Sequence, residues 1–338
     1  MARSVSWGVL STARIGVERV IPAMQRGEIS RIDAIASRDA THAQAVADQL
    51  GIPKAYGSYE ELLADPGIEA VYNPLPNHLH VPWTVKAMEA GKHVLCEKPI
   101  ALNAEQAEQL IEARGRTGRH VVEAFMVRHN PQWRRARAIA MDGSIGEVRA
   151  IQCLFTYYLV DPSNVRNQAE IGGGGLFDIG CYAITTARFI FGAAPERVVG
   201  LIDRDPEFRT DRLTSGLAEF PRHRHLAFIV STQLLPHQRV QICGTKGRIE
   251  IEVPFNAPHD RPCRIFIDRE GDRFGSGVAA EEMPTCDQYT LQGDAFSRIV
   301  LGEEEPEYPI EDAVMNMRII DAFFRSARNG SWESIQAA

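Results

Sequence analysis

A charged pair at the end of a predicted strand is the first candidate for chemistry. Residues 94–96 form an apolar run of strand length, and Glu97, Lys98 and Pro99 follow it directly. In an open parallel sheet, ligands bind at the carboxyl ends of the strands, and Pro99 favours extended geometry at Lys98. A lysine held there beside a carboxylate is placed to act on a bound ligand. An ordinary surface ion pair would have the same local sequence.

The turn after the first predicted strand is a candidate nucleotide site. Residues 11–16 occupy the position of a G-x-G-x-x-G fingerprint, but only Gly16 is a glycine. Ser11 and Ala13 are small enough for a pyrophosphate to approach the backbone, and a helix expected over about residues 18–25 would supply amide donors. A plain strand–helix connection would look similar. The candidate cofactor residues of this turn are Ser11, Thr12, Ala13, Arg14 and Ile15.

The end of the second predicted strand indicates which dinucleotide binds. A carboxylate at this position would bond the ribose hydroxyls of NAD, but the strand ends in Ser37 and Arg38. Serine and arginine can hold a 2′-phosphate, which favours NADP. Asp39 follows one place later and keeps NAD possible. Alternatively, Arg38 is a solvated loop residue.

The elements that must position these residues fall into two regions. Over residues 1–125, strands alternate with helices at a spacing typical of βαβ units and a parallel sheet, which predicts a Rossmann dinucleotide-binding domain. Over residues 126–338, long strands with short turns predict a largely antiparallel open sheet with helices on one face, forming the substrate and oligomerisation domain. The predicted fold class is therefore α/β followed by α+β.

Several local features are also expected. Thr41, Ser58 and Asn103 are placed to cap helices, and the Gly-rich, charged segment 270–286 is expected to be a mobile loop. The helices expected in the second region cover about residues 131–141, 178–191, 288–301 and 310–329.

Composition excludes several classes of function. The 338-residue chain has a formal net charge of −7, which disfavours nucleic acid and anionic membranes as partners. No apolar run approaches the roughly 20 residues of a membrane span, and no signal peptide is expected. The 6 cysteines include no C-x-x-C pair, and no histidine cluster has metal-ligand spacing, so neither a metal site nor a disulfide framework is expected. A reducing cytoplasm fits this usage.

Three separated motifs, in order, resemble the Gfo/Idh/MocA oxidoreductases. They are the run AVYNPLPNHLH at 70–80, the run AGKHVLCEKP at 90–99, and the glycine-rich GGGGLFDIGCY at 172–182. The opening WGVLSTARI at 7–15 and EAFMVRHNPQ at 123–132 resemble a subgroup that includes D-xylose dehydrogenases, glucose–fructose oxidoreductase and dihydrodiol dehydrogenases. The resemblance implies a Rossmann domain followed by an open-sheet domain that also forms a homodimer or homotetramer interface.

The resemblance also implies roles for individual residues. Lys98 matches the family's catalytic lysine, and Asp178 and Tyr182 match the catalytic pair of the second signature. Many relatives have histidine in place of Tyr182, whereas tyrosine is typical of the sugar and dihydrodiol group. The positions that match cofactor-binding ones beyond the first turn are Leu75, Pro76, Asn77, His80, Glu97 and Lys98.

These residues suit the oxidation of a sugar hydroxyl, which needs a base for the proton and a hydride acceptor. Tyr182 could be the base; free tyrosine has a pKa of about 10, and a nearby ammonium such as Lys98 favours the phenolate. Asp178 comes four residues earlier, on the same helical face, where it could hold a substrate hydroxyl or orient the lysine. Without the resemblance, a core tyrosine and a helix cap would be the favoured explanation of the pair.

Substrate contacts are expected from polar side chains and one aromatic platform. A solvated loop would have a similar composition, and Tyr157, Tyr158 and Tyr289 are further candidates for which a structural role is favoured. The candidate substrate residues are Arg128, Asn130, Trp133, Asn164 and Arg166.

The expected function is an NADP-dependent sugar dehydrogenase that oxidises the anomeric carbon of an aldose, such as the pentose D-xylose, to its lactone. A trans-dihydrodiol dehydrogenase or a keto-sugar reductase would use the same residues with a different pocket. A non-catalytic, nucleotide-sensing regulator is the competing class, although it would not need Lys98 and Tyr182.

Overall fold

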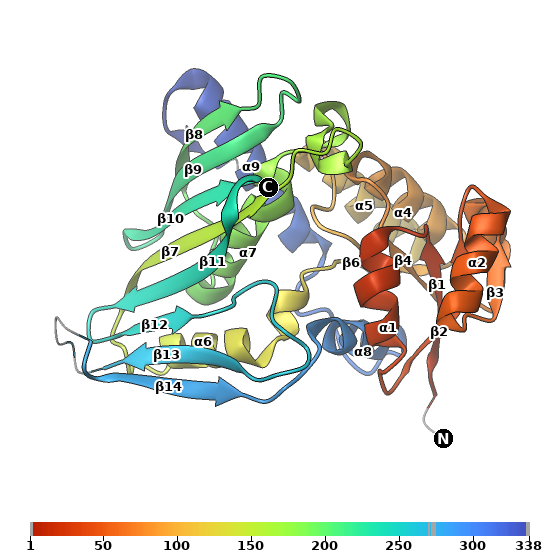
Figure 1. Ribbon diagram of the computed structural model, residues 1–338, viewed down its shortest axis with the longest axis horizontal. Coiled ribbons are helices and arrows are strands. Elements are labelled where there is room, and N and C mark those ends of the chain that lie inside the picture. The colour runs from red at the N-terminus through yellow and green to blue at the C-terminus, as the bar shows by residue number, and fades with distance from the viewer. Residues whose placement is uncertain (1–2, 270, 272–274, 336–338) are drawn as a thin grey trace. The chain divides into compact units, whose positions relative to one another are not determined.

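The computed structural model describes residues 3–269, 271 and 275–335, and it divides into two compact units (Figure 1). Unit 1 comprises Met1–Met126 and Gln288–Met317, and unit 2 comprises Val127–Asp287 and Arg318–Ala338. The first break lies next to the expected boundary after residue 125. The return of residues 288–317 to unit 1 differs from the expected division, which assigned them to the second domain.

Unit 1 contains a parallel sheet with the strand order β3-β2-β1-β4-β5-β6. This order confirms the predicted doubly wound Rossmann architecture. The strands are β1 Val5–Leu10, β2 Ser30–Ala36, β3 Lys54–Tyr56, β4 Ala70–Asn73, β5 His93–Cys96 and β6 Val121–Glu123. The helices are α1 Ile21–Met24, α2 Ala40–Leu50, α3 Tyr59–Ala64, α4 His80–Glu89, α5 Ala104–Thr117 and α8 Gln288–Val300.

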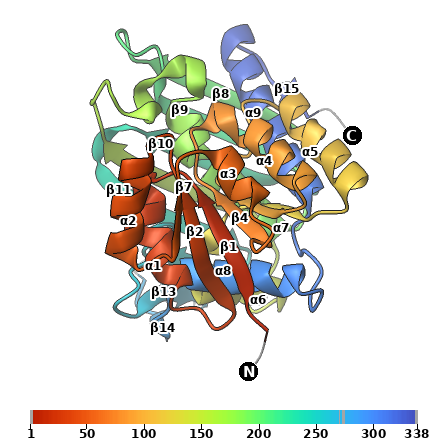
Figure 2. The same ribbon diagram turned by 90° about the vertical axis from the view of Figure 1, so that its right-hand side faces the viewer.

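Helices flank this sheet on both sides (Figure 2), and alternating residues of β1 face opposite sides of it. Val5, Trp7 and Val9 belong to a buried apolar cluster with residues of α1, α2 and α8. Gly8 faces the other side, where a Cβ atom would lie 2.6 Å from the Leu62 side chain of α3. Helices therefore cover both faces, as the nearly continuous apolar strands predict.

Helix α8 joins unit 1 through buried polar contacts as well as through its apolar side. The Asp294 carboxylate accepts hydrogen bonds from the backbone amides of Glu28 (2.9 Å) and Ile29 (3.3 Å), just before β2. The Trp7 indole donates to Ser297 Oγ at 3.0 Å and packs against Phe296. These partners are more than 260 positions away along the chain, so no local pattern predicts them.

Two helix starts in unit 1 differ from the expectations. The first helix begins at Arg14, not at residue 18, and passes through a π-helical turn, Gly16–Val20, before α1. Asp39, rather than Thr41, caps α2, because its carboxylate accepts from the amides of Thr41 and His42. The predicted caps Ser58 and Asn103 are confirmed.

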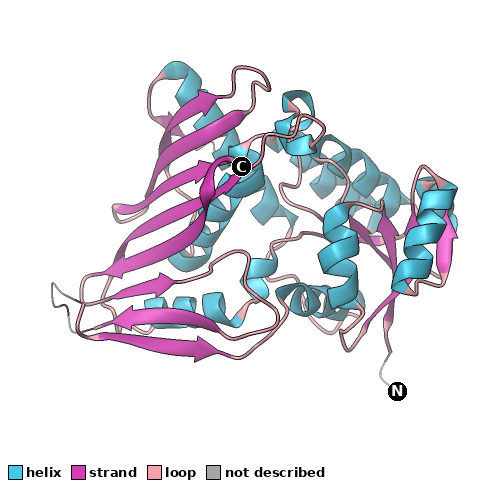
Figure 3. Cartoon of the chain, in the orientation of Figure 1, coloured by secondary structure: helices cyan, strands magenta, loops and turns pink. Residues whose placement is uncertain are grey.

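Unit 2 contains a mixed sheet with the strand order β14-β13-β12-β11-β7-β10-β9-β8-β15 (Figure 3). Its pairs are antiparallel except for β7 with β10, which confirms the largely antiparallel prediction. The strands are β7 Val148–Tyr158, β8 Arg197–Arg204, β9 Asp211–Phe220, β10 Arg224–Ser231, β11 Gln233–Gly244, β12 Arg248–Ile251, β13 Cys263–Asp268, β14 Val278–Met283 and β15 Glu333–Ser334.

Three helices pack on the inner face of this sheet: α6 Pro131–Met141, α7 Cys181–Phe191 and the second part of α9 Ile310–Asn329. Phe323 of α9 makes an edge contact with Phe228 of β10, at a centroid distance of 5.1 Å. The opposite face carries exposed apolar residues, including Leu201 (76% exposed), Leu217 (48%) and Ile229 (44%). One face of the sheet is therefore buried within unit 2 and the other is not.

The expected loop over residues 270–286 contains a strand, so this expectation was wrong. Strand β14 pairs in antiparallel register with β13, with Cys263 opposite Met283. The sequence of β14 carries charges and small residues instead of an apolar alternation, which hides it from pattern analysis. Residues 270 and 272–274 of this segment lie outside the described part of the chain.

Candidate active site

The turn after β1 has the backbone of a nucleotide-binding fingerprint, although its sequence lacks most of the glycines. Ser11 has a φ of 104°, in the region that favours glycine, and its amide donates to the Ala36 carbonyl at 2.9 Å. The helix that begins at Arg14 directs its first amides towards the end of β1. Small residues and helix amides at this position fit the pyrophosphate of a dinucleotide.

The strand order places this turn at the centre of the sheet. The chain leaves β1 towards β2 and β3 on one side and continues to β4, β5 and β6 on the other. Ligands of open α/β sheets bind at such a reversal, outside the carboxyl ends of the strands. The turn at Ser11 and the end of β4 at Asn73 both lie at this end.

Arg38 and Asp39, which follow β2, differ in exposure and in hydrogen bonding. Arg38 is exposed, and Ser37 beside it is buried, with 9% of its surface accessible. The Asp39 carboxylate is engaged at the start of α2, at 2.9 Å from the Thr41 amide. A carboxylate used in this way is less available to ribose hydroxyls, and Arg38 remains exposed beside it.

The loop after β4 is tied to the Lys98 segment by one buried histidine. The two ring nitrogens of His80 lie 2.8 Å from the Pro99 carbonyl oxygen and 2.6 Å from that of Leu75. Asn73 supports the same loop, because its side chain accepts from the Leu75 amide and donates to the His80 carbonyl. The structure therefore places His80 as a link between two loops, with Pro76 and Asn77 half-buried next to it.

Burial controls the charge of this histidine. Desolvation lowers the pKa of His80 to about 4, although the two carbonyl oxygens favour the protonated ring. Lys98 and His78 lower this pKa further through charge repulsion. With this pKa the ring is neutral near pH 7, and its single N–H group donates to one of the two carbonyl oxygens.

Side chains of two neighbouring strands hold Glu97 and the backbone beyond Lys98. Glu97 accepts from the Tyr72 hydroxyl of β4 at 2.7 Å and from the Lys98 amide at 3.2 Å. Beyond the cis Lys98–Pro99 peptide, the Ile100 amide donates to Glu123 of β6 at 2.9 Å. Tyr72 and Glu123 were not predicted from the sequence. Both lie within predicted strands, and the pairing of those strands cannot be read from local sequence.

In unit 2, Asp178 lies at the centre of a polar cluster. Its Oδ2 atom accepts from the Tyr157 hydroxyl at 2.6 Å and from Arg166 Nε at 2.9 Å. The attraction of Asp178 is the largest cause that raises the pKa of Arg166, and burial is the largest cause that raises the pKa of Tyr157. Asp178 is thus held as a carboxylate by one cation and one hydroxyl donor.

Tyr182 follows in α7, with its ring packed between phenylalanines. It is 6% exposed, and its ring centroid lies 5.3 Å from that of Phe255 and 5.9 Å from that of Phe155. An electrostatic interaction with Tyr182 is the smallest of the causes that raise the pKa of Arg166, after those from Asp178 and Tyr157. Arg166 is therefore a cation of unit 2 that interacts with this tyrosine.

A structural role was favoured for Tyr157 from the sequence, but its hydroxyl donates a hydrogen bond to Asp178. Residues Asp178 and Tyr157 are 21 positions apart, on a π-helical turn and a strand, so their contact depends on how α7 packs against β7. Asp178 lies inside the turn Leu176–Gly180, which excludes the alternative that it caps the helix.

The predicted substrate residues take different places. Arg166 joins the Asp178 cluster, whereas Asn130 caps α6 and Asn164 caps the short turn Val165–Asn167. Trp133 is 1% exposed and donates to the Pro254 carbonyl at 2.6 Å, so it is a core residue and not the expected aromatic platform. Arg128 is buried, with 4% of its surface accessible.

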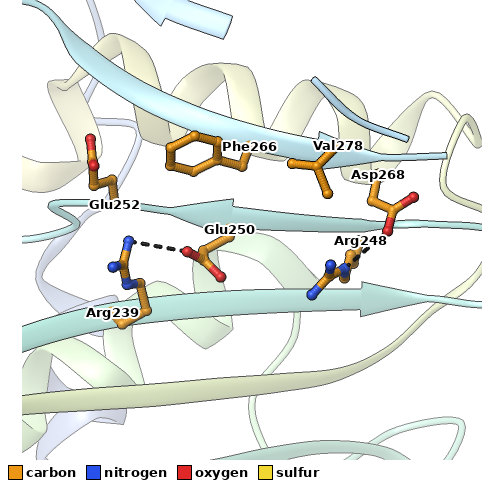
Figure 4. A pocket seen from close by; sticks show the side chains of 7 residues that line it. All are labelled: Arg239, Arg248, Glu250, Glu252, Phe266, Asp268 and Val278. Carbon is orange, nitrogen blue, oxygen red and sulfur yellow. Dashed lines mark hydrogen bonds and ion pairs between the residues drawn. The ribbon is translucent and has the colours of Figure 1, made fainter. Parts of the chain in front are cut away.

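A cavity of about 290 Å³ lies away from these residues, against strands β11 to β14 of unit 2 (Figure 4). Ion pairs cross it, with Arg239 3.0 Å from Glu250 and Arg248 3.3 Å from Asp268. Its remaining lining residues are Glu252, Phe266 and Val278. Glu252 pairs with Arg264 at 2.7 Å, so each charged side chain of this lining already has a partner of opposite charge.

Neither a membrane-crossing helix nor a metal-binding cluster occurs within residues 3–269, 271 and 275–335. Among those residues, no helix is both long and apolar enough to cross a membrane. Within the same residues, no group of three or more histidine, cysteine, aspartate or glutamate side chains could hold a metal ion.

The chain matches two family models. Residues 5–125 match the Gfo/Idh/MocA model described as an oxidoreductase family with a NAD-binding Rossmann fold, and residues 133–250 match the Gfo/Idh/MocA C-terminal domain.

Three similar proteins cover almost all of the chain. An uncharacterised oxidoreductase of Rhizobium meliloti is 46% identical, over 98% of this chain and 99% of its own. D-xylose 1-dehydrogenase (NADP(+)) 2 of Haloferax volcanii is 36% identical, over 96% of this chain and 98% of its own. The crystal structure of a 3-ketoreductase from Actinomadura kijaniata, in complex with NADP and TDP-benzene, has a TM-score of 0.89 at 29% identity, over 96% of this chain and 98% of that one.

Proposed function

The chain belongs to the Gfo/Idh/MocA oxidoreductase family, and from that premise we propose that it is an NADP-dependent sugar dehydrogenase. It oxidises the anomeric carbon of an aldose, with a pentose such as D-xylose as the first candidate, and releases the lactone. The observation that carries this proposal is the cluster of Tyr157, Arg166 and Asp178 with Tyr182 in unit 2. The similarity to a D-xylose dehydrogenase along nearly the whole chain supports the substrate class.

The residues divide the work of the reaction as follows. NADP, when bound, accepts the hydride from the anomeric carbon. Tyr182 takes the proton of the anomeric hydroxyl, and its phenolate is stabilised by Arg166. Asp178, fixed by Tyr157 and Arg166, accepts a hydrogen bond from a neighbouring sugar hydroxyl. The Lys98 ammonium stabilises the negative charge that develops on the substrate oxygen.

The proposed choice of NADP over NAD rests on the end of β2. Arg38 offers a planar guanidinium beside the buried Ser37, while Asp39 is engaged as a helix cap. We propose that Ser11, Thr12, Ala13, Arg14 and Ile15 contact the pyrophosphate and that Leu75, Pro76, Asn77 and Glu97 lie along the nicotinamide half.

A panel of aldoses with NADP, followed through the absorbance of the reduced cofactor, tests the proposal directly. We expect turnover with at least one pentose and its loss in Tyr182→Phe, which keeps the ring but has no proton-accepting oxygen. A complete lack of turnover on sugars and diols by the wild-type enzyme would contradict the proposal.

A keto-sugar reductase is the second candidate, and the similarity to a solved 3-ketoreductase favours it. The same residues would then run in reverse, with Tyr182 donating the proton to the carbonyl oxygen. Oxidation of NADPH in the presence of keto-sugars, with and without an attached nucleotide, separates the reductase from the dehydrogenase. A far higher kcat/KM for a keto-sugar than for any aldose would assign the protein to this class.

We also propose that the enzyme is a homodimer or homotetramer through the outer face of the unit 2 sheet. Leu201, Leu217 and Ile229 expose apolar side chains there, and the paired charges of the cavity lie on the same sheet. Size-exclusion chromatography with light scattering should give a mass of two or four chains, reduced by Leu217→Glu. A monomeric wild-type protein would contradict this assembly.

A further inference from the structure

The helix that carries Asp178 and Tyr182 begins without a capping side chain of its own. Its first turn, Leu176–Gly180, follows Gly174 and Gly175, and no side chain of the turn's own N-cap accepts its amides. The first amides of a helix have no partner within the helix, and a buried helix start must find acceptors elsewhere. The start of α7 therefore depends on a group from another element.

Asp211, the first residue of β9, supplies that group. Its Oδ2 atom accepts from the Leu176 amide at 2.5 Å and from the Thr214 hydroxyl at 3.1 Å. Asp211 is 1% exposed, and burial raises its pKa to about 6, so the carboxylate is ionised at neutral pH. A negative charge at a helix N-terminus is favourable.

The glycine run is shaped to receive this carboxylate. Gly174 has a φ of +122°, and a Cβ atom at this position would lie 1.9 Å from Asp211 Oδ1. A Cβ atom at Gly175 would lie 3.2 Å from the Asp211 carbonyl oxygen. Glycine at position 174 thus leaves the space that the capping oxygen occupies.

We propose that Asp211 is a positioning residue, which caps the helix from a distant strand and so fixes the register of Asp178 and Tyr182. The inference rests on the proposed function, because those two residues are the ones assigned to the reaction. Asp211 acts only through the helix start.

Removing the carboxylate tests this role in the full-length enzyme. In Asp211→Ala we expect amide hydrogen exchange over residues 176–182 to become about tenfold faster, because the helix start is no longer capped. The kcat for the best aldose should fall about thirtyfold with a smaller change in KM, since small misplacements of reacting groups are costly. The Kd for NADP should stay within about twofold, because unit 1 is unchanged.

Two comparison variants separate positioning from general loss of stability. Asp211→Asn keeps an oxygen acceptor for the Leu176 amide and should recover most of the kcat. Asp205→Ala removes another buried aspartate of unit 2, which accepts from the amides of Glu207 and Phe208 at 2.8 Å in a different turn. It should leave the kcat and the exchange of residues 176–182 as in the wild type.

The space at Gly174 provides an independent test if Asp211→Ala does not fold. Gly174→Ala should push the carboxylate away and speed exchange over residues 176–182. Gly192→Ala at the other end of α7 is the matched control, because Gly192 also has a positive φ (+63°) but no atom within 4 Å of an added Cβ. In Asp211→Gly combined with Gly174→Ala the clash with the carboxylate is gone and only the backbone strain of alanine at φ +122° remains, so the second change should add less than it does in the wild type.

Unchanged exchange over residues 176–182 in both Asp211→Ala and Gly174→Ala would overturn the inference, as would equal loss of kcat in Asp211→Asn and Asp211→Ala. Failure of the proposed function gives a different result. The wild type would then turn over no aldose, while the exchange measurement would still decide whether Asp211 orders the helix start.

Discussion

Arg38 and Asp39 are neighbours at the end of β2 with different partners. Asp39 accepts two amides at the start of α2, whereas Arg38 projects an exposed guanidinium. Glu97, the neighbour of Lys98, is likewise bound, by the Tyr72 hydroxyl. At the scale of single residues, one carboxylate of each pair supports the fold, and the adjacent cation is the candidate for recognition or chemistry.

Replacing Arg38 tests cofactor choice. In Arg38→Ala the Kd for NADP should rise about tenfold to a hundredfold, because a charge-assisted bidentate contact is lost, while the Kd for NAD changes little. Fluorescence titration with both dinucleotides measures this difference. Arg31→Ala, at the opposite end of β2, removes another exposed arginine and should affect neither. Equal weakening of NADP and NAD would show that Arg38 does not recognise the phosphate.

Replacing Lys98 tests the chemical step. In Lys98→Met the kcat should fall about a thousandfold, the scale of a lost catalytic group, while NADP still binds. Steady-state kinetics and cofactor titration separate the two effects. Lys86→Met removes an exposed lysine of α4 that pairs with Glu60 at 3.6 Å, and it should leave the kcat unchanged. A near-normal rate in Lys98→Met would exclude the lysine from the mechanism.

At the scale of elements, strand ends acquire their shape from side chains that bond to backbone. His80 links the loop after β4 to Pro99, Glu123 holds the amide of Ile100, and Asp211 holds the start of α7. Ser11 keeps a glycine-like φ of 104° while its amide bonds to Ala36. Buried side chains thus fix the backbone next to the candidate catalytic residues.

His80 makes the stability of the folded protein depend on pH, in a direction that its pKa defines. Its pKa is about 4 in the folded protein, mainly through burial, against 6.5 for the ordinary group. Between these values the unfolded chain binds more protons, so stability falls as the pH is lowered from about 6.5 to about 4, by up to about 3 kcal/mol.

Urea unfolding of wild type and His80→Gln at pH 7.5 and pH 5 measures this contribution. The variant should be less stable at pH 7.5 and lose less stability on acidification. His42→Gln replaces an exposed histidine and should follow the wild-type pH dependence. Parallel curves for wild type and His80→Gln would contradict a neutral, buried ring.

At the scale of the whole molecule, the chain returns to its first unit after completing most of its second. Residues 288–317 complete unit 1, and α9 passes from unit 1 to unit 2 within one helix. The buried contacts of Asp294, Ser297 and Phe296 with the first strands hold this return. Unit 1 therefore needs two separate segments of the sequence for its core.

Removing Asp294 tests how far unit 1 depends on its second segment. Asp294→Ala leaves the amides of Glu28 and Ile29 without their acceptor, and we expect the free energy of unfolding to fall by about 2–3 kcal/mol. Denaturant melts, with and without NADP, measure the loss.

Glu311→Ala is the matched control for this test. It removes an exposed ion pair between the same two segments, with Arg114, and should cost less than about 1 kcal/mol. Similar losses in both variants would mean that buried hydrogen bonds do not hold the second segment.

The sequence by itself determined the alternation of strands and helices, the family, and the residues Lys98, Asp178 and Tyr182, because periodicity and motifs are local properties of the chain. Local sequence also predicted Ser37 and Arg38 as contacts to the cofactor. Only the tertiary structure brought Tyr157 and Arg166 to Asp178, Asp211 to Leu176, and α8 to β1. Those contacts join residues far apart in sequence, and they form because buried polar groups must find partners that only packing can provide.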